Sequence, residues 1–389
     1  MAVLKVILAN LVIFALLYAA VEIPYSAFRY LTAAGIPATC WLMEHPGETI
    51  RFDPDRGFFL TRTPSRFARI IDRQLEIVGT YRGNAQGFPD RDDFTVQRSN
   101  RYERRFAVFG DSFTAGTFVV SRTWPERLED TDSAGRGQPL KLLNFALTGV
   151  GLATWASILR NIVVRDEYEL DGLIIAVAWD DLDRKFALFD QVDSQTLAYT
   201  RAPSWDPALQ PKTSSEAASL LKNHAIPETY ILSPSDFDAA LAGHWNAPRK
   251  WKFRLTTRIA DAVTAKSNGE EQPASGFDSG QIYLIEEIRR LTKEHLLPTV
   301  VAYIPSREEL LSPDSRRAKR TKQFAEMIGA SFLDGREAFR GLSSQEIKEN
   351  WYPHDGHWNQ AGSDRFADFM SRQIESWGNT QSPTTVGGR

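Results

Sequence analysis

Short apolar runs alternate with amphipathic stretches along most of this chain of 389 residues. The apolar runs predict five buried strands, at 106–109, 140–147, 173–179, 299–304 and 331–333. The third run is continuously apolar, as is typical of a parallel strand that is buried on both faces. Apolar residues at helical spacing lie between these runs and predict helices that start at 123, cover 154–164, 279–293 and 313–328, and follow Asn359. This alternation predicts an α/β three-layer sandwich with a parallel five-stranded sheet.

Two of the expected helices carry clear start signals. Thr123 and Glu126 have the spacing of a capping box, with Pro125 in the first turn, where proline is tolerated. Asn359 stands where it would cap the last helix.

The pattern breaks between the third and fourth expected strands. There, residues 183–278 form a long stretch rich in Trp, Pro, Ser and His where a single helix would suffice. Ligands bind at the carboxyl edge of open α/β sheets, so we interpret this stretch as an insertion at that edge that caps a site and sets substrate choice. Within it, Gly243–Asn246 resembles Gly356–Asn359 but lacks an Asp at the matching place, so we interpret His244 as a chance resemblance to the site or as a cap residue.

The N-terminus has a pattern of its own. Val6–Val21 is apolar except for Asn10, and Lys5 precedes it. The run has about the length of a short membrane span or of a signal-peptide core. Tyr18 stands where cleavage would favour a small residue, so we expect an uncleaved signal anchor, a transmembrane helix over 1–24, with a cleaved signal peptide as the alternative. An anchor of this kind places the rest of the chain on the periplasmic or extracytoplasmic side of the inner membrane.

The remaining segments complete the expected organisation. Residues 25–100 carry several prolines and many charges without strong periodicity, and we expect a lead-in segment with short strands. Residues 101–378 would form the main domain, with the insertion at 183–278, and 379–389 a disordered tail of small and polar residues.

Composition and charge narrow the classes of function. The net charge of −3 gives no general argument for binding nucleic acid. The single cysteine, Cys40, excludes an intrachain disulfide and a cysteine metal cluster. His354, Asp355 and His357 do not have the spacing of a zinc site, and Gly149–Gly151 lacks the rest of a dinucleotide fingerprint. We therefore expect neither a metal nor a cofactor.

Two stretches carry candidate chemistry. GDSFTAG at 110–116 follows the first expected strand and places Ser112 in a strand-to-loop turn. A serine hydroxyl is a weak nucleophile unless a base activates it. Asp355 and His357 stand just before the last expected helix and could complete a Ser-His-Asp triad with Ser112. A structural serine and a structural histidine are the alternative.

These stretches resemble the SGNH (GDSL-type) hydrolase family, in particular its membrane-anchored bacterial members. The family has a GDS block after its first strand and an Asp and a His before its final helix. The resemblance covers 101–377, implies a flavodoxin-like fold, and is extended by Asn84–Phe88, which is similar to an Asn-x-x-Gly-Phe element before the GDS strand. It implies that Ser112 is the nucleophile, His357 the base, and Asp355 the residue that orients the base. The gap of two between Asp and His departs from the usual three, because His354 stands at the third position.

The resemblance also implies an oxyanion hole made by the N–H groups of Ser112 and Gly149 and by the side chain at position 180. The family has asparagine there, whereas this chain has Asp180. A carboxylate beside a developing negative charge would cost on the order of several kcal/mol. Three alternatives stay open: Asp180 is protonated and donates, it points away, or the protein binds an acyl or glycan ligand and turns it over slowly or not at all.

The resemblance implies carboxyl-ester chemistry. We expect a serine esterase that removes O-acyl groups, in particular O-acetyl groups, from an envelope or exported carbohydrate, or that acts on a small ester. The alternatives are an O-acyltransferase on such a glycan, or a catalytically inactive SGNH-like binding or scaffold protein. The expected partners are the acylated substrate and, through the N-terminal helix, the membrane, with no nucleic acid.

Overall fold

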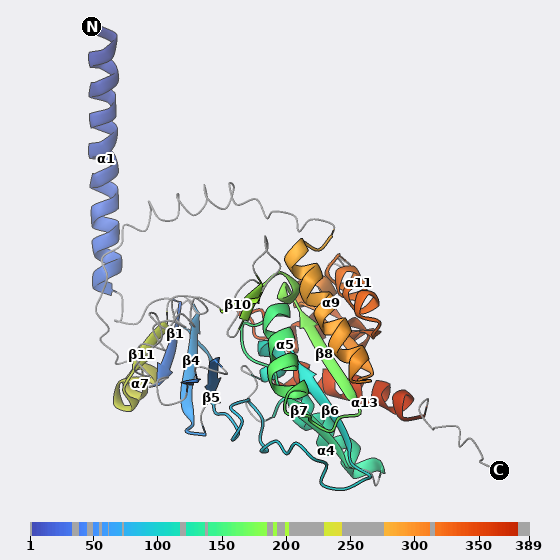
Figure 1. Cartoon of the computed structure of the whole chain (residues 1–389). Helices are drawn as coiled ribbons and strands as arrows, with labels where there is room; N and C mark the ends of the chain where they lie inside the picture. Colours follow the sequence, from blue (N-terminus) through green and yellow to red (C-terminus); the bar gives the residue numbers. More distant parts are fainter. Residues whose placement is uncertain are drawn as a thin grey trace, which may run out of the picture.

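The computed structural model describes residues 2–32, 39–44, 50–53, 57–60, 62–71, 74–116, 122–136, 139–184, 190–192, 199–201, 229–242, 276–311 and 316–379. A five-stranded sheet lies at its centre, in the order β13-β12-β8-β6-β7, and all its neighbours are parallel (Figure 1). The strands are β6 (Arg104–Phe109), β7 (Leu140–Asn144), β8 (Gly172–Ala178), β12 (Thr299–Ile304) and β13 (Ser331–Asp334). The five expected parallel strands are thus confirmed, although β7 ends three residues before the expected end at 147.

The central sheet is buried on both faces because its strands are apolar at successive positions. In β8, Leu173, Ile175 and Val177 pack into one core and the intervening residues into the other. The first core includes residues of α5 (Leu152–Ile158) with its π-helical continuation η1 (Leu159–Val164), α9 (Ser279–Glu294) and α11 (Arg316–Ile328). The second includes residues of α4 (Trp124–Arg136), η4 (Gly335–Phe339), α12 (Ser344–Glu349) and α13 (Gln360–Asn379). The three-layer arrangement is therefore confirmed.

The expected helix starts are confirmed as well. The backbone N–H of Glu126 donates to the Thr123 hydroxyl at 3.3 Å, and the N–H of Thr123 donates to the Glu126 carboxylate at 2.7 Å. The Asn359 side chain accepts from the N–H of Ala361 at 2.9 Å. The remaining short helices are α3 (Ser112–Ala115), η2 (Asp181–Asp183) and α10 (Arg307–Leu311).

A second, smaller sheet has the order β11-β1-β4-β5, and we call it the small sheet. It joins β1 (Cys40–Glu44), β4 (Ser65–Ile71) and β5 (Gln74–Tyr81) of the lead-in to β11 (Thr229–Leu232) of the insertion. Helix α7 (Pro234–Leu241) covers one of its faces, where Phe237 packs against Cys40, Leu42 and Ala68. Lead-in and insertion thus share one sheet, which the sequence pattern did not indicate.

Other parts of these two segments form hairpins. One pairs β2 (Ile50–Asp53) with β3 (Gly57–Leu60), and the other pairs β9 (Asp190–Val192) with β10 (Tyr199–Arg201). Most of the insertion, with His244, lies outside the described residues, and so does the C-terminal segment from 380. The interpretation of the insertion as a cap, of His244 as a cap residue and of the tail as disordered therefore stays a prediction.

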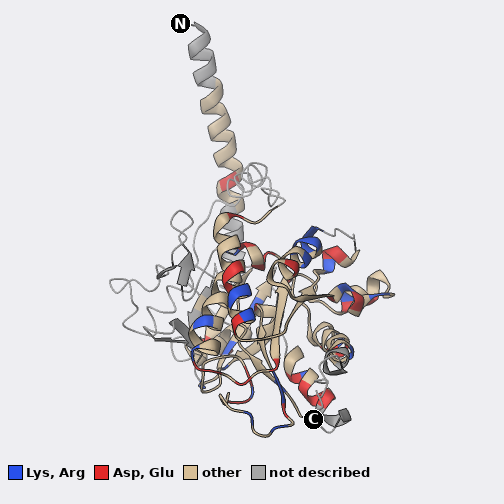
Figure 2. Ribbon diagram, turned by 45° about the vertical axis from the view of Figure 1, so that its right-hand side comes forward, with Lys and Arg blue, Asp and Glu red and all other residues tan. Residues whose placement is uncertain are grey.

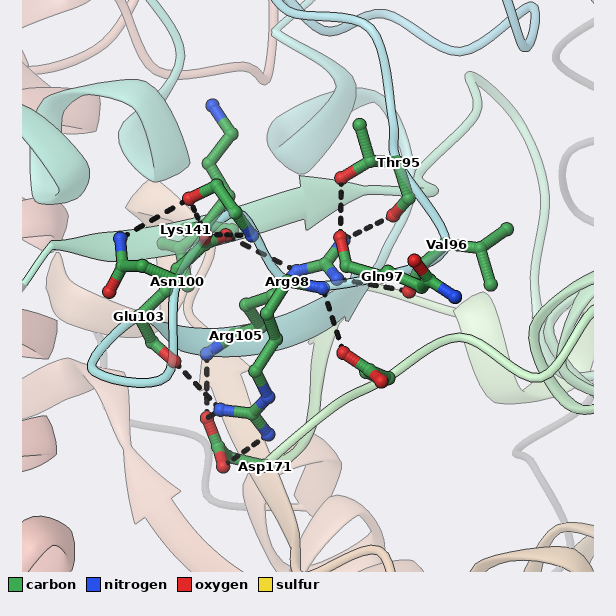
Figure 3. Close-up of polar contacts among 12 residues, drawn as sticks. Thr95, Val96, Gln97, Arg98, Asn100, Glu103, Arg105, Lys141 and Asp171 are labelled. Atoms are coloured by element: carbon green, nitrogen blue, oxygen red, sulfur yellow. Dashed lines mark hydrogen bonds and ion pairs between the residues drawn. The ribbon is translucent and has the colours of Figure 1, made fainter.

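Polar contacts connect the end of the lead-in to the amino-terminal ends of the central strands (Figure 3). The Arg105 side chain is fully buried and donates to the carbonyl oxygen of Val96 at 3.0 Å. Arg98 makes a bidentate contact with the Asp171 carboxylate at 2.7 and 2.8 Å, and that carboxylate also accepts from the N–H of Arg105 at 2.8 Å. Since Arg105 is the second residue of β6 and Asp171 directly precedes β8, these contacts fix the lead-in to two central strands.

The N-terminal segment forms helix α1 (Ala2–Thr32), which extends away from the rest of the structure (Figure 1). It continues past the expected end of the anchor at 24. Among the described residues, no helix has both the length and the apolar character that a membrane crossing requires. The expected transmembrane helix over 1–24 is therefore not confirmed.

Candidate active site

Ser112 lies at the carboxyl end of β6, in a turn that only a glycine at position 110 allows. A Cβ at Gly110 would lie 2.3 Å from Oγ1 of Thr114. Asp111 then caps the short helix α3, since its carboxylate accepts from the N–H of Phe113 at 3.0 Å. Gly116 ends the helix in the left-handed region, at φ 71°. The tight turn lifts the Ser112 hydroxyl out of the sheet edge, as the GDS spacing predicts.

The structure brings Ser112, His357 and Asp355 together. Oγ of Ser112 lies 2.7 Å from Nε2 of His357, and Nδ1 of His357 lies 2.5 Å from Oδ1 of Asp355. All three residues are buried. The gap of two residues places Asp355 correctly because the same Oδ1 also accepts from the backbone N–H of His357 at 3.0 Å. One carboxylate oxygen thereby fixes both the backbone and the ring of the histidine.

The loop that carries the histidine closes on itself. Trp351 and Trp358 pair as an isolated antiparallel bridge, and the N–H of Tyr352 donates to the carbonyl oxygen of His357 at 3.1 Å. This closure fixes the start of α13 and the position of the histidine together.

Two aromatic rings hold the imidazole. Phe113 stacks on His357 with 4.7 Å between ring centroids, and Trp179 meets it edge-on at 4.8 Å. A Cβ at Gly356 would lie 2.7 Å from the Trp179 ring, so only glycine fits at this position in the present arrangement. Sequence reasoning did not identify Phe113, Trp179 or Gly356 as site residues, although each is adjacent in the chain to a predicted site residue. Their packing depends on contacts between distant blocks.

The small sheet supplies groups beside Asp355. Nε of Arg69, on β4, lies 3.9 Å from Oδ2 of Asp355. The Glu76 carboxylate, on β5, accepts from the N–H groups of His354 at 2.7 Å and Asp355 at 3.2 Å. Burial opposes ionisation of Asp355, but the hydrogen bonds and charge of His357, together with the charge of Arg69, hold the pKa of this carboxyl below its usual range. No motif in the sequence pointed to Arg69 or Glu76.

A buried charge cluster lies on the other side of the nucleophile. Nη1 of Arg184 lies 3.3 Å from the Asp111 carboxylate and 3.1 Å from that of Asp181, and it donates to the carbonyl oxygen of Val150. Asp181 also accepts from the N–H of Ala178, the last residue of β8. Burial and the charge of Asp111 raise the pKa of Asp181 well above its usual range, against the opposing charge of Arg184. The cluster ties the end of β8 to the turn of Ser112.

The three expected oxyanion-hole positions differ in their surroundings. Ser112 begins α3, with its N–H at the start of the helix. Gly149 has φ 78°, in the turn that follows β7, and its neighbour Thr148 shares a hydroxyl contact of 3.4 Å with Tyr81 of β5. The Asp180 side chain is 63% exposed, and its Oδ1 lies 3.5 Å from Nη2 of Arg184. The Asp180 carboxylate is therefore in contact with solvent and close to a cation.

In the described part of the chain, no group of three or more His, Cys, Asp or Glu side chains is arranged to hold a metal ion.

Comparison with known proteins gives structural similarities only. No family model and no curated protein sequence matches the chain. It is similar to a lipase/acylhydrolase from Enterococcus faecalis, with 12% identity, a TM-score of 0.35, and coverage of 70% of this chain and 96% of that chain. It is also similar to a catalytic mutant of an acetylxylan esterase from Geobacillus stearothermophilus, with 12% identity, a TM-score of 0.35, and coverage of 70% of this chain and 94% of that chain. A third similar structure is a GDSL-like lipase from Bacteroides thetaiotaomicron, with 10% identity, a TM-score of 0.33, and coverage of 72% of this chain and 92% of that chain. TM-scores this low establish neither a family nor an activity.

Proposed function

We propose that this protein is a serine esterase with an SGNH-like α/β domain. The observation that carries the proposal is the buried, hydrogen-bonded series from Ser112 through His357 to Asp355. A serine, a histidine and a carboxylate in this order have the geometry of an activated nucleophile with an oriented base.

The proposed reaction has two halves. Oγ of Ser112 attacks the ester carbonyl carbon while Nε2 of His357 takes its proton, and Asp355 stabilises the imidazolium. The ester C–O bond then breaks, and the leaving alcohol takes the proton from His357. Water then attacks the acyl carbon and loses a proton to His357. The bond between that carbon and Oγ of Ser112 breaks, Oγ takes the proton from His357, and a carboxylic acid is released. The N–H groups of Ser112 and Gly149 are the proposed donors to the oxyanion.

For the substrate we propose an O-acyl group, in particular an O-acetyl group, of an envelope or exported carbohydrate. Transfer of the acyl group to a glycan hydroxyl in place of water stays the alternative within the same chemistry. A catalytically inactive binding protein is favoured by one observation, the carboxylate of Asp180 where the family pattern has asparagine.

We also propose that α1 attaches the protein to a membrane from the extracytoplasmic side. Leu11, Phe14, Leu16 and Leu17 of this helix are 60–70% exposed, and the helix carries little charge in the described part (Figure 2). A fusion of alkaline phosphatase to the C-terminus, which is active only after export, tests the orientation. Alkaline carbonate extraction tests the attachment, and a fusion that is inactive, or a protein that is fully released, would contradict the proposal.

A fluorophosphonate probe on the full-length protein tests the catalytic proposal. We expect a covalent adduct on Ser112 by mass spectrometry, and we expect Ser112→Ala and His357→Ala to lose it. His354→Ala is the matched control, because its exposed imidazole lies in the same loop, and labelling should persist. A folded wild-type protein that is not labelled would overturn the proposal and leave the binding protein.

A further inference from the structure

The small sheet reaches the candidate active site at both of its ends. Glu76 of β5 accepts from two N–H groups of the loop that carries Asp355, and Arg69 of β4 faces the same carboxylate. At the other end of β5, Tyr81 contacts Thr148, next to Gly149. The strands of the lead-in therefore form part of the wall of the site, beside the residues contributed by the central sheet.

Arg69 is held in a defined position. Its guanidinium lies 4.8 Å from the centroid of the Trp41 ring, and Trp41 is its direct partner in the antiparallel register of β1 and β4. Within the described part of the chain, the buried Nε of Arg69 has no hydrogen-bond partner. The carboxylate oxygen near this atom is Oδ2 of Asp355, whereas His357 uses Oδ1. The Arg69 side chain is 20% exposed, and the opposite charge of Asp355 offsets the desolvation of its buried part.

Arg69 lies close to Asp355, whereas Arg184 contacts Asp111, Asp181 and Asp180 instead. The charged and titratable groups beside Asp355 are Arg69, Glu76 and Tyr352, with the exposed His354 next to it in the chain. Arg307 of α10 donates to the carbonyl oxygens of Tyr352 and Pro353 in the same loop, at 3.0 Å each. On the side of the nucleophile, Asp111 contacts Oγ of Ser112.

We propose that Arg69 is a positioning residue that acts through Asp355: its charge limits how strongly the carboxylate stabilises the protonated form of His357. The base then stays unprotonated to lower pH than it would beside an uncompensated carboxylate. This inference rests on the proposed function, because it assigns the small sheet a part in the same triad. Glu76 complements Arg69 by holding the backbone of the Asp355 loop.

The test is the pH dependence of ester hydrolysis by the full-length protein, with 4-nitrophenyl acetate as the probe. In Arg69→Met, which keeps an apolar stem on Trp41, we expect the acid limb of kcat/KM to move to higher pH by about 0.5–1 unit. Arg69→Lys retains the charge and should stay within about 0.2 units of wild type. A merely structural role would lower the rate at every pH and leave the limb in place.

Arg66→Met is the matched control. Arg66 is on the same strand, pairs with Glu44 at 2.8 Å, and lies over the Phe237 ring at 4.8 Å, but it contacts the side of the small sheet that carries α7. We expect its acid limb to be unchanged. An unshifted limb in Arg69→Met, or an equal shift in Arg66→Met, would overturn the inference. If Arg69→Met does not fold, Arg69→Gln removes the same charge with a polar side chain and decides the matter in the same way.

A second measurement separates this inference from the proposed function. In full-length protein with ¹³C-labelled histidine rings, the His357 signal, assigned with His357→Gln, can be titrated without any substrate. A midpoint that rises in Arg69→Met and not in Arg66→Met supports the inference even if wild type hydrolyses no ester, which would overturn only the proposed function. A midpoint that does not move contradicts the role of Arg69 whatever the activity.

Discussion

The central sheet and the small sheet contribute to one site in different ways. The central strands are parallel and buried on both faces, and the carboxyl ends of β6 and β8 carry Ser112 and the Asp181 cluster. The small sheet joins segments far apart in the chain, with Leu42 paired to Tyr230. It supplies neither the nucleophile nor the base, yet it supplies Arg69 and Glu76 beside the carboxylate. The central sheet thus carries the residue proposed to react with the substrate, and the small sheet carries residues that set the position and charge environment of Asp355.

The largest expected effect comes from the triad carboxylate itself. Asp355→Asn should lower kcat on the order of 10⁴-fold, since an amide cannot hold the imidazole in the required tautomer or stabilise its charged form. Steady-state ester hydrolysis measures this, with Asp368→Asn on the exposed side of α13 as the control. A loss of less than about tenfold would mean that the triad geometry is not used for catalysis.

The same substitution has a consequence for stability. Because the pKa of Asp355 lies below its usual range in the folded protein, its contribution to stability is present above the unfolded pKa, near 4, and is lost as the pH falls through the folded value. Wild type should therefore lose more stability than Asp355→Asn between about pH 4 and pH 2 in thermal unfolding. An equal loss in both proteins would contradict the assigned ionisation.

The aromatic packing around the base gives the next largest effect. Gly356→Ala places a methyl group 2.7 Å from the Trp179 ring, so the ring or the loop must move. A displacement of about 1 Å at the histidine can cost roughly 10²-fold in rate, and we expect a loss of this order with the protein still folded. Gly280→Ala in α9 is the control, because its added Cβ meets Asp278 at an ordinary 3.4 Å. Unchanged kinetics in Gly356→Ala would show that the aromatic contact does not orient the base.

Substitutions of Glu76 test how much the small sheet contributes to activity through the Asp355 loop. Glu76→Ala removes the acceptor for two backbone N–H groups of the Asp355 loop, and we expect a loss of roughly tenfold in kcat/KM. Glu76→Gln keeps a carbonyl oxygen at the same place and should lose less than about threefold. If both variants lost activity equally, the charge of Glu76, rather than its hydrogen bonds, would be the part that matters.

The central sheet could be predicted from the sequence, whereas the small sheet and its contacts with the site could not. The central strands, the turn at Ser112 and the pair Asp355–His357 were predictable because each is a local pattern of a few residues. The pairing of β1 with β11 was not, because the two strands are separated by the rest of the lead-in, three strands of the central sheet and the first part of the insertion, and neither strand has a pattern that indicates its partner. Arg69 could not be predicted as a site residue because it lies in the lead-in, where the sequence has no strong periodicity. Its contact with Asp355 forms only when the two sheets lie side by side.

Asp180 shows the limit of reasoning from a motif. The resemblance implies that the side chain at position 180 belongs to the oxyanion hole, but the structure shows it 63% exposed and close to Arg184. The turn explains the difference: Trp179 has φ 41°, so the chain leaves β8 sharply, and it is Asp181 that turns back to bond the N–H of Ala178. Asp181, the next residue along the chain, is therefore the buried carboxylate at the end of β8.

The smallest expected effect follows from this exposure. A charge in contact with water is strongly screened, so Asp180→Asn should raise kcat by no more than about threefold. Asp183→Asn, which removes a nearby carboxylate paired with Arg320, is the control and should leave kcat unchanged. Ester hydrolysis at several salt concentrations checks the screening directly, because the difference between wild type and Asp180→Asn should shrink as salt rises. An increase above about thirtyfold would show instead that the carboxylate reaches the oxyanion during the reaction and slows the enzyme from within the site.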